Sequence, residues 1–241
     1  MGNVEISYSR VQTYERCPWL YHLVYDEGWR SGPTAPAALG QSIHKALDAY
    51  LAKSNTEYTL DRLFEIYDEH WVNEGFGTPQ QTFEAYEKGR QMLQHFFDLD
   101  KKRTSEVIET EKEFNIELAP GVHFRGTIDR LDRQPDGTYE VIEYKTQAQP
   151  WSKARIAEDR QITFYALGLG EILNGAPLKL AYYFLSSGAC LVTTRTQNQI
   201  EEARALILDV AEKINRHVFE PNYQYCPRCE FGKRCSKFKP S

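Results

Sequence analysis

The chain has 241 residues, of which 41% are hydrophobic, and it carries a formal net charge of −5 at pH 7. This length suffices for a sizeable core in one large domain or two small ones. The acidic balance excludes a generally basic nucleic-acid coat, so any nucleic-acid site has to be a local patch. No apolar run approaches the roughly 20 residues that cross a bilayer, and the N-terminus lacks the apolar segment of a signal peptide. We therefore expect a cytoplasmic protein.

The first hundred residues are predicted to be mainly helical. A helix over residues 7–25 has Ser9 as its expected N-cap, and Pro18 would interrupt or restart this helix. Apolar side chains at helical spacing predict a second helix over residues 38–54. Two further helices are expected at about 60–72 and 79–102.

Beyond this helical part the pattern changes to alternating strands, which predicts an α/β core with a helical N-terminal elaboration. We treat the chain as a single domain, 1–241, with three parts. These are a mainly helical part that includes His44 (1–104), the core (105–195), and a C-terminal helix with a cysteine cluster (196–241). The expected strands are 106–118, 122–133, 139–146, 179–187 and 190–196, and the expected helices are 153–173 and 198–218.

Charged residues occupy one face of the strand "YEVIEYK". Alternation puts Glu143 and Lys145 on the same face. The preceding loop, residues 135–137, has the composition of a three-residue hairpin turn with Gly137 in the left-handed conformation. Counting back from that turn places Asp129 directly opposite Glu143 on the neighbouring strand, so the three charged side chains should converge.

Two adjacent carboxylates repel each other unless a positive charge lies between them. Lys145 could supply that charge, and so could a bound divalent cation. Mg²⁺ and Mn²⁺ take oxygen ligands, often one or two carboxylates together with water and a substrate phosphate. Such a metal activates water and stabilises charge on a phosphate. The alternative is a structural ladder of surface ion pairs, and the hairpin alone leaves both interpretations open.

Three other residues are weaker candidates by themselves. His44 shares a helix face with apolar residues, where a histidine is more often a hydrogen-bonded core residue than a metal ligand. Gln161 and Tyr165 form an i, i+4 pair on one predicted helix face. Tyr165 could equally be a core residue.

The cysteines are unevenly distributed. An odd count with three near the C-terminus favours metal or cluster ligation over disulfides in a reducing cytosol. The segment "CPRCEFGKRC" has the spacing C-x2-C-x5-C, which suits zinc or an iron–sulfur cluster, and the spacing does not decide between them. Cys17 or Cys190 could supply a fourth thiolate. The same tail is basic, which suits either a solvated end or a phosphodiester contact: Arg228, Lys233, Arg234, Lys237 and Lys239 stand against Glu230.

Five motifs together resemble the RecB-type nucleases of the PD-(D/E)XK superfamily. "GQSIHKAL" is similar to the Gly-x-x-x-His motif, "GTIDRLD" to Gly-x-x-Asp-Arg-x-Asp, "EYK" to (D/E)-x-K, and "QITFY" to Gln-x-x-x-Tyr. A cysteine in "CPW" with the C-terminal cysteines resembles the iron–sulfur branch. That branch includes the CRISPR-associated RecB-type exonucleases and the nuclease domain of AddB. The motifs occur in the family's order, and the chain length favours the CRISPR-associated type.

The resemblance implies a fold and a role for each matching residue. The fold would be a restriction-endonuclease-like core, with a central mixed sheet flanked by helices and a C-terminal Fe–S cap. The motif assignment leaves Cys190 as a non-ligand. Apart from the motifs, Glu111 and Glu113 on the preceding strand are candidate acids that would support the site. The metal, Mg²⁺ or Mn²⁺, would be held by His44, Asp129, Glu143 and the backbone carbonyl of Tyr144. Lys145 would be catalytic together with Asp129 and Glu143, and Gln161 and Tyr165 would position DNA. A [4Fe-4S] cluster would be bound by Cys17, Cys226, Cys229 and Cys235.

The resulting expectation is a Mg²⁺- or Mn²⁺-dependent deoxyribonuclease, an exonuclease on single-stranded ends. The resemblance implies a place in spacer processing in CRISPR-based antiviral defence. Its partners would be DNA and proteins of CRISPR adaptation or recombination. The alternative is a DNA-end-binding or assembly subunit with little nuclease activity of its own. Zinc in place of the cluster is a further alternative.

Overall fold

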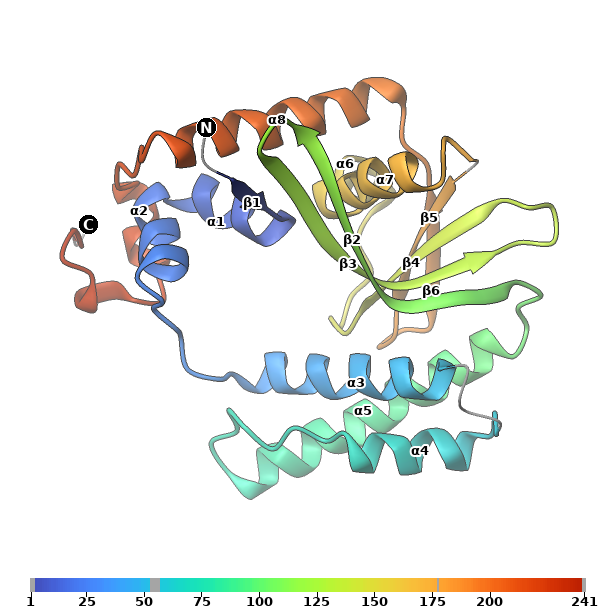
Figure 1. Cartoon of the computed structure of the whole chain (residues 1–241). Coiled ribbons are helices and arrows are strands. Elements are labelled where there is room, and N and C mark those ends of the chain that lie inside the picture. The colour runs from blue at the N-terminus through green and yellow to red at the C-terminus, as the bar shows by residue number, and fades with distance from the viewer. Residues whose placement is uncertain (1–2, 53–56, 177, 240–241) are drawn as a thin grey trace. The chain divides into compact units, whose positions relative to one another are not determined.

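The computed structural model describes residues 3–52, 57–176 and 178–239 (Figure 1). The chain divides into two compact units. Each unit joins segments that are distant in the sequence, unlike the three consecutive parts expected above. The single domain over 1–241 stays a prediction. The central unit contains Pro33–Glu113 and Thr127–Arg195, and the terminal unit contains Met1–Gly32, Phe114–Gly126 and Thr196–Ser241.

The central unit is built on a mixed β-sheet. In it, β3 pairs antiparallel with β4, β4 pairs parallel with β5, and β5 pairs antiparallel with β6. The expected strands are all present, with ends that shift by at most three residues. Their bounds are β2 (Glu106–Ala119), β3 (Val122–Arg133), β4 (Tyr139–Lys145), β5 (Leu178–Phe184) and β6 (Ala189–Thr193), with part of β2 and β3 belonging to the terminal unit.

Helices lie on both faces of this sheet (Figure 1). On one face, buried Tyr144 and Tyr183 from the strands pack with Leu47 and Phe96 from the helices in one apolar cluster. Burial of such side chains supplies the main driving force for folding. The arrangement confirms an α/β fold with a mixed sheet flanked by helices. That face is covered by α3 (Ala35–Leu51), α4 (Leu60–Glu69) and α5 (Pro79–Asp100), and the other by α6 (Lys153–Glu158) and α7 (Arg160–Ile172).

Two helix predictions in this unit need correction. The helix expected over 153–173 is split, because Asp159 has extended backbone angles (φ −66°, ψ 125°) and begins a new helix. Its side chain accepts a hydrogen bond from the backbone N–H of Ile162 at 3.2 Å, as an N-cap residue does. The helix expected over 38–54 begins earlier, at Ala35, and ends at Leu51; residues 53–54 lie outside the described part of the chain.

The terminal unit contains the first and last described segments. A short strand, Val4–Ile6, was not expected, and it pairs parallel with β3. Because this strand occupies the start, the first helix is capped by Ser7 and not by Ser9. Pro18 restarts the helix, as predicted. The elements are β1 (Val4–Ile6), α1 (Tyr8–Arg16), α2 (Pro18–Tyr21), the π-helical turn η1 (His22–Asp26), α8 (Gln197–Asn215) and the 3-10 turns η2 (Tyr223–Arg228) and η3 (Gly232–Arg234).

Among the described residues, none of the helices combines the length and the hydrophobicity that crossing a membrane requires. The cytoplasmic location stays a prediction.

Candidate metal centre

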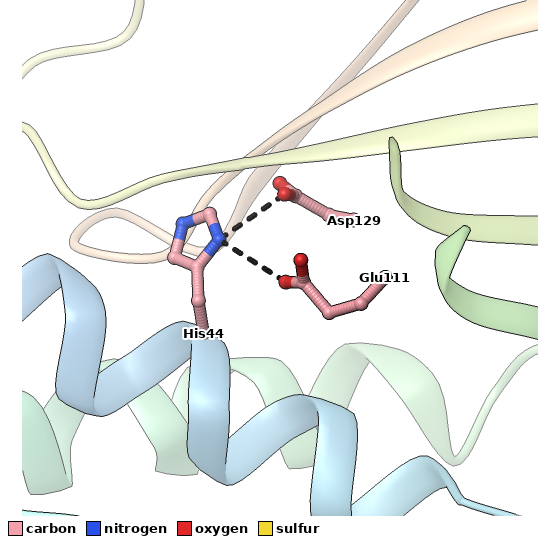
Figure 2. A group of neighbouring side chains, drawn as sticks. All are labelled: His44, Glu111 and Asp129. Atoms are coloured by element: carbon pink, nitrogen blue, oxygen red, sulfur yellow. Dashed lines mark ion pairs between the residues drawn. The ribbon is translucent and has the colours of Figure 1, made fainter. Parts of the chain in front are cut away.

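Three side chains of the central unit converge from three different elements (Figure 2). His44 projects from α3, Asp129 from β3 and Glu111 from β2. The Nδ1 atom of His44 lies 3.1 Å from an Asp129 carboxylate oxygen and 4.0 Å from one of Glu111. One potential ligand atom from each residue lies within 4.8 Å of the others. An imidazole nitrogen and carboxylate oxygens at this separation can hold a single cation.

The β3–β4 hairpin brings Asp129 to this point. Gly137 in the turn has a φ of +85°, which favours glycine, and the N–H of Gln134 donates to the carbonyl of Thr138 at 2.8 Å. Arg130 pairs with Ile142. Continuing that register by one residue sets Asp129 opposite Glu143, so the register counted from the sequence is confirmed.

Among the described residues, only one of the two carboxylate oxygens of Glu143 accepts hydrogen bonds. Its Oε1 atom accepts hydrogen bonds from Lys145 Nζ at 2.8 Å and from Gln161 Nε2 at 2.7 Å. Gln161 also accepts from Lys145 at 2.9 Å and donates to the hydroxyl of Tyr165 at 2.9 Å. The sequence motifs "EYK" and "QITFY" therefore meet in one network, although they are separated along the chain.

The second oxygen of Glu143 is the feature that points to a ligand. The side chain is 5% exposed, and its Oε2 atom is buried without a hydrogen-bond partner among the described residues. An unsatisfied buried carboxylate oxygen is costly. A divalent cation between Asp129 and Glu143 would satisfy it, so the donor set fits a hard metal ion.

The electrostatics of the group agree with a missing positive charge. Burial, with the charge of Asp129 added, raises the pKa of Glu143 to about 7 against the opposing effect of Lys145. Burial lowers the pKa of His44, but the hydrogen bond and charge of Asp129 outweigh it, and the pKa rises to about 9. Burial and Asp129 also raise the pKa of Glu111. The negative charge of Asp129 thus helps to raise the pKa of all three groups, and a bound cation would offset that charge.

Glu111 has a more central place than the sequence indicated. It was expected only to support the site from the preceding strand, yet it belongs to the converging triad with His44 and Asp129. Its backbone has a φ of +42°, which is unusual for a residue with a side chain. This local departure from regular strand geometry is not predictable from alternation. Glu113, the other acid considered, is exposed on β2 and lies outside the triad.

Tyr144 has the orientation expected for its side chain. The side chain is 3% exposed and lies in the apolar cluster, against the His44 ring with 6.0 Å between ring centres. Its backbone N–H donates to the second Asp129 oxygen at 2.7 Å. Its carbonyl as a metal ligand, and the catalytic and DNA-positioning roles of the other residues, stay predictions.

The terminal unit gathers four of the five cysteines around one cavity. Cys17 from the first helical segment lies in an apolar cluster with Phe231, Cys229 and Cys235. Cys190, by contrast, is on β6 in the central unit. Among the described residues the thiols do not form a metal-sized group with all sulfurs within 4.8 Å of one another. The cavity is lined by Cys17, Cys226, Cys229 and Cys235 together with Trp19, Leu20, Leu23 and Tyr225.

Comparisons with known proteins bear on the whole chain. The chain is similar to a solved structure titled "Crystal structure of SSO0001", with 20% identity over 83% of this chain and 96% of that chain and a TM-score of 0.42. The comparison with curated proteins gave no match. The sequence model of the family described as "PD-(D/E)XK nuclease superfamily" matches residues 5–236. That match covers nearly the full length and includes every residue of the hairpin site, so the chain belongs to the PD-(D/E)XK nuclease superfamily.

Proposed function

We propose that this protein is a metal-dependent deoxyribonuclease that acts as an exonuclease on single-stranded DNA ends. The observation that carries the proposal is the buried, unpartnered Oε2 atom of Glu143 beside Asp129. Membership of a nuclease superfamily gives the reaction class. Preference for single strands and for ends comes from the resemblance to RecB-type nucleases and is part of the proposal.

Each residue of the site has a task in this proposal. His44, Asp129 and Glu143 would hold Mg²⁺ or Mn²⁺, and Glu111 is close enough to His44 to add a fourth protein ligand. The bound cation would activate water and stabilise charge on the phosphate that is cleaved.

Lys145 has a fixed position next to the carboxylates. Glu143 and Gln161 both accept hydrogen bonds from its ammonium group, which leaves a third donor for a water molecule or a phosphate oxygen. Gln161 bonds to both Lys145 and Glu143 and so holds the two side chains in place. Tyr165, bonded to Gln161, supports this network from the helix.

We further propose a [4Fe-4S] cluster in the terminal unit, bound by Cys17, Cys226, Cys229 and Cys235. Support comes from the shared cavity that these four side chains line. A cluster is wider than a single zinc ion, so thiolates spread around a cavity suit it better than a tight zinc site with bonds of about 2.3 Å. The cluster would join the first helical segment to the C-terminal tail and thereby stabilise the unit.

The surroundings of these cysteines suit a nucleic-acid strand. Lys237 lies 5.4 Å from the centre of the Trp19 ring, and Lys239 lies 4.0 Å from that of Tyr223. Cations interleaved with aromatic rings suit phosphates and unstacked bases. The proposal therefore assigns the chain to the iron–sulfur branch of RecB-type nucleases. Membership of that branch would give the protein a role in processing DNA ends during CRISPR adaptation.

The test is digestion of end-labelled single-stranded DNA by anaerobically purified protein with Mg²⁺ or Mn²⁺. We expect shortening from the ends, lost in EDTA and in Lys145→Ala. Cys190→Ser is the matched control and should stay active. Tight DNA binding without cleavage under either metal would contradict the nuclease proposal and favour a DNA-end-binding or assembly subunit.

A further inference from the structure

A tryptophan and an arginine lie beside the catalytic lysine, outside all of the sequence motifs. The ring of Trp151 packs edge-on against Tyr182, with ring centres 5.2 Å apart, and it is half-buried. The Lys145 ammonium lies 5.4 Å from the centre of the Trp151 ring. The Arg155 guanidinium lies 3.9 Å from the same ring centre. One indole therefore contacts two cations, of which Lys145 belongs to the proposed active site.

Arg155 stands on a short helix that is firmly held. The helix α6 buries Ile156, which is 2% exposed. Arg195 donates to the carbonyl of Ile156 at 2.8 Å and to that of Asp159 at 3.0 Å, and so fixes both ends of the turn that follows Arg155. The position of Arg155 is thus set by the fold and not by a flexible loop.

The guanidinium group of Arg155 has no acidic partner among the described residues. The side chain is exposed, and none of the described carboxylates forms an ion pair with it. Stacking on an indole uses the face of the guanidinium and leaves its N–H donors free at the edge. A planar fork of free donors matches the oxygens of a phosphodiester.

We propose that Arg155, stacked on Trp151, is a phosphate-binding site for the phosphodiester that adjoins the one being cleaved. Trp151 orients Arg155 and also limits the movement of Lys145. The inference rests on the proposed nuclease function and deepens it, because it assigns a contact to the DNA backbone beside the metal. The contact reads no base and would therefore hold any sequence.

The test combines binding and kinetics on the full chain. Binding of a fluorescent single-stranded oligonucleotide is measured in EDTA over a series of NaCl concentrations, and KM and kcat are measured with Mn²⁺. The variants are Arg155→Gln and Trp151→Phe. The matched control is Lys179→Ala, which removes an exposed positive charge at the opposite end of the β4–β5 pair.

For Arg155→Gln we expect binding at low salt to weaken roughly tenfold. The slope of log K against log salt should become shallower by about 0.7, the value for one lost phosphate contact on a single strand. KM should rise while kcat changes little. Trp151→Phe leaves a smaller ring beneath Arg155 and should show the same changes as Arg155→Gln to a smaller extent. Lys179→Ala should keep the wild-type slope.

The phosphate-binding site would be overturned if Arg155→Gln left the salt slope and KM unchanged, or changed them no more than Lys179→Ala does. The nuclease assignment would still stand in that case, provided that the wild type cleaves DNA. A wild type that neither binds nor cleaves single-stranded DNA would overturn both.

Discussion

The backbone N–H of Tyr144 donates a 2.7 Å hydrogen bond to the carboxylate of Asp129. The two residues lie on neighbouring strands, so this bond ties the Asp129 side chain on β3 to the backbone between Glu143 and Lys145. It fixes one oxygen of Asp129, while the other faces His44 at 3.1 Å. Asp129 is thereby held in a fixed position next to Glu143, which is the kind of preorganisation that the proposed catalysis would require.

Asp129→Asn tests the negative charge of Asp129 separately from its hydrogen bond with the Tyr144 N–H. Asparagine keeps an acceptor for the Tyr144 N–H but carries no negative charge. We expect unfolding stability within about 1 kcal/mol of wild type and nuclease activity lower by roughly 10²–10³-fold. Chemical denaturation and a Mn²⁺-dependent cleavage assay give the two values. An Asp129→Asn protein with wild-type activity would show that this carboxylate is not needed.

Gln161 is predicted to position Lys145 and Glu143. Gln161→Ala removes its hydrogen bonds to both residues, and we expect kcat to fall roughly 10–100-fold, as for other residues that orient metal-site groups. Tyr165→Phe is the matched control, because it removes the hydroxyl that accepts from Gln161 and leaves the bonds of Gln161 to Lys145 and Glu143 in place; its kcat should fall less. Equal losses in both variants would argue against a positioning role for Gln161.

The stability of the metal-free protein should fall as pH rises. Burial and Asp129 raise the pKa of Glu143 from 4.5 to about 7, and Asp129 raises that of His44 from 6.5 to about 9 against the effect of burial. The folded state therefore holds more protons than the unfolded state between these values, and stability is lost as pH rises through about 7 and then about 9.

A divalent cation replaces these protons, so its stabilising effect should grow over the same range. Thermal unfolding from pH 5 to 9.5, with EDTA or with Mn²⁺, measures both trends. His44→Gln should remove the upper part of the pH dependence. A metal-free protein whose stability is flat over this range would contradict the proposed proton occupancy.

How much the sequence could predict differs between the parts of the site. The Asp129–Glu143 register followed from one turn, because a three-residue loop at 135–137 sets Gln134 opposite Thr138, and counting back from there pairs Asp129 with Glu143. The α/β class and the expected helices and strands also followed from periodicity. The break at Asp159 did not, because a capping aspartate inside an apolar helical pattern looks like any surface residue of a helix.

The place of Glu111 and the Trp151–Arg155 stack could not be predicted either. Glu111 depends on a backbone distortion within β2, and no local pattern signals it. Trp151 and Arg155 lie in a segment of irregular structure and a short helix, where side-chain directions follow from tertiary packing. Among the cysteines, spacing left the fourth ligand open between Cys17 and Cys190, whereas the fold gathers Cys17 with the three C-terminal cysteines at one cavity.

The cysteine set predicts a difference between two single substitutions. Cys17→Ser should lower iron content and the melting temperature, because it removes one of the four thiols at the cavity. Cys190→Ser should leave both unchanged, since Cys190 lies on β6. Iron analysis and absorbance near 400 nm (roughly where Fe–S proteins absorb) of anaerobic preparations test this. A colourless wild type with stoichiometric zinc would contradict the cluster and support a zinc site.

Anomalous diffraction from a crystal soaked in Mn²⁺ tests the central claim most directly. We predict a manganese peak within bonding distance of Asp129 and the Oε2 atom of Glu143, next to His44 and absent from Asp129→Asn crystals. A fully soaked wild-type crystal with no peak there, or with manganese bound only elsewhere, would contradict the assignment of this hairpin as the metal centre.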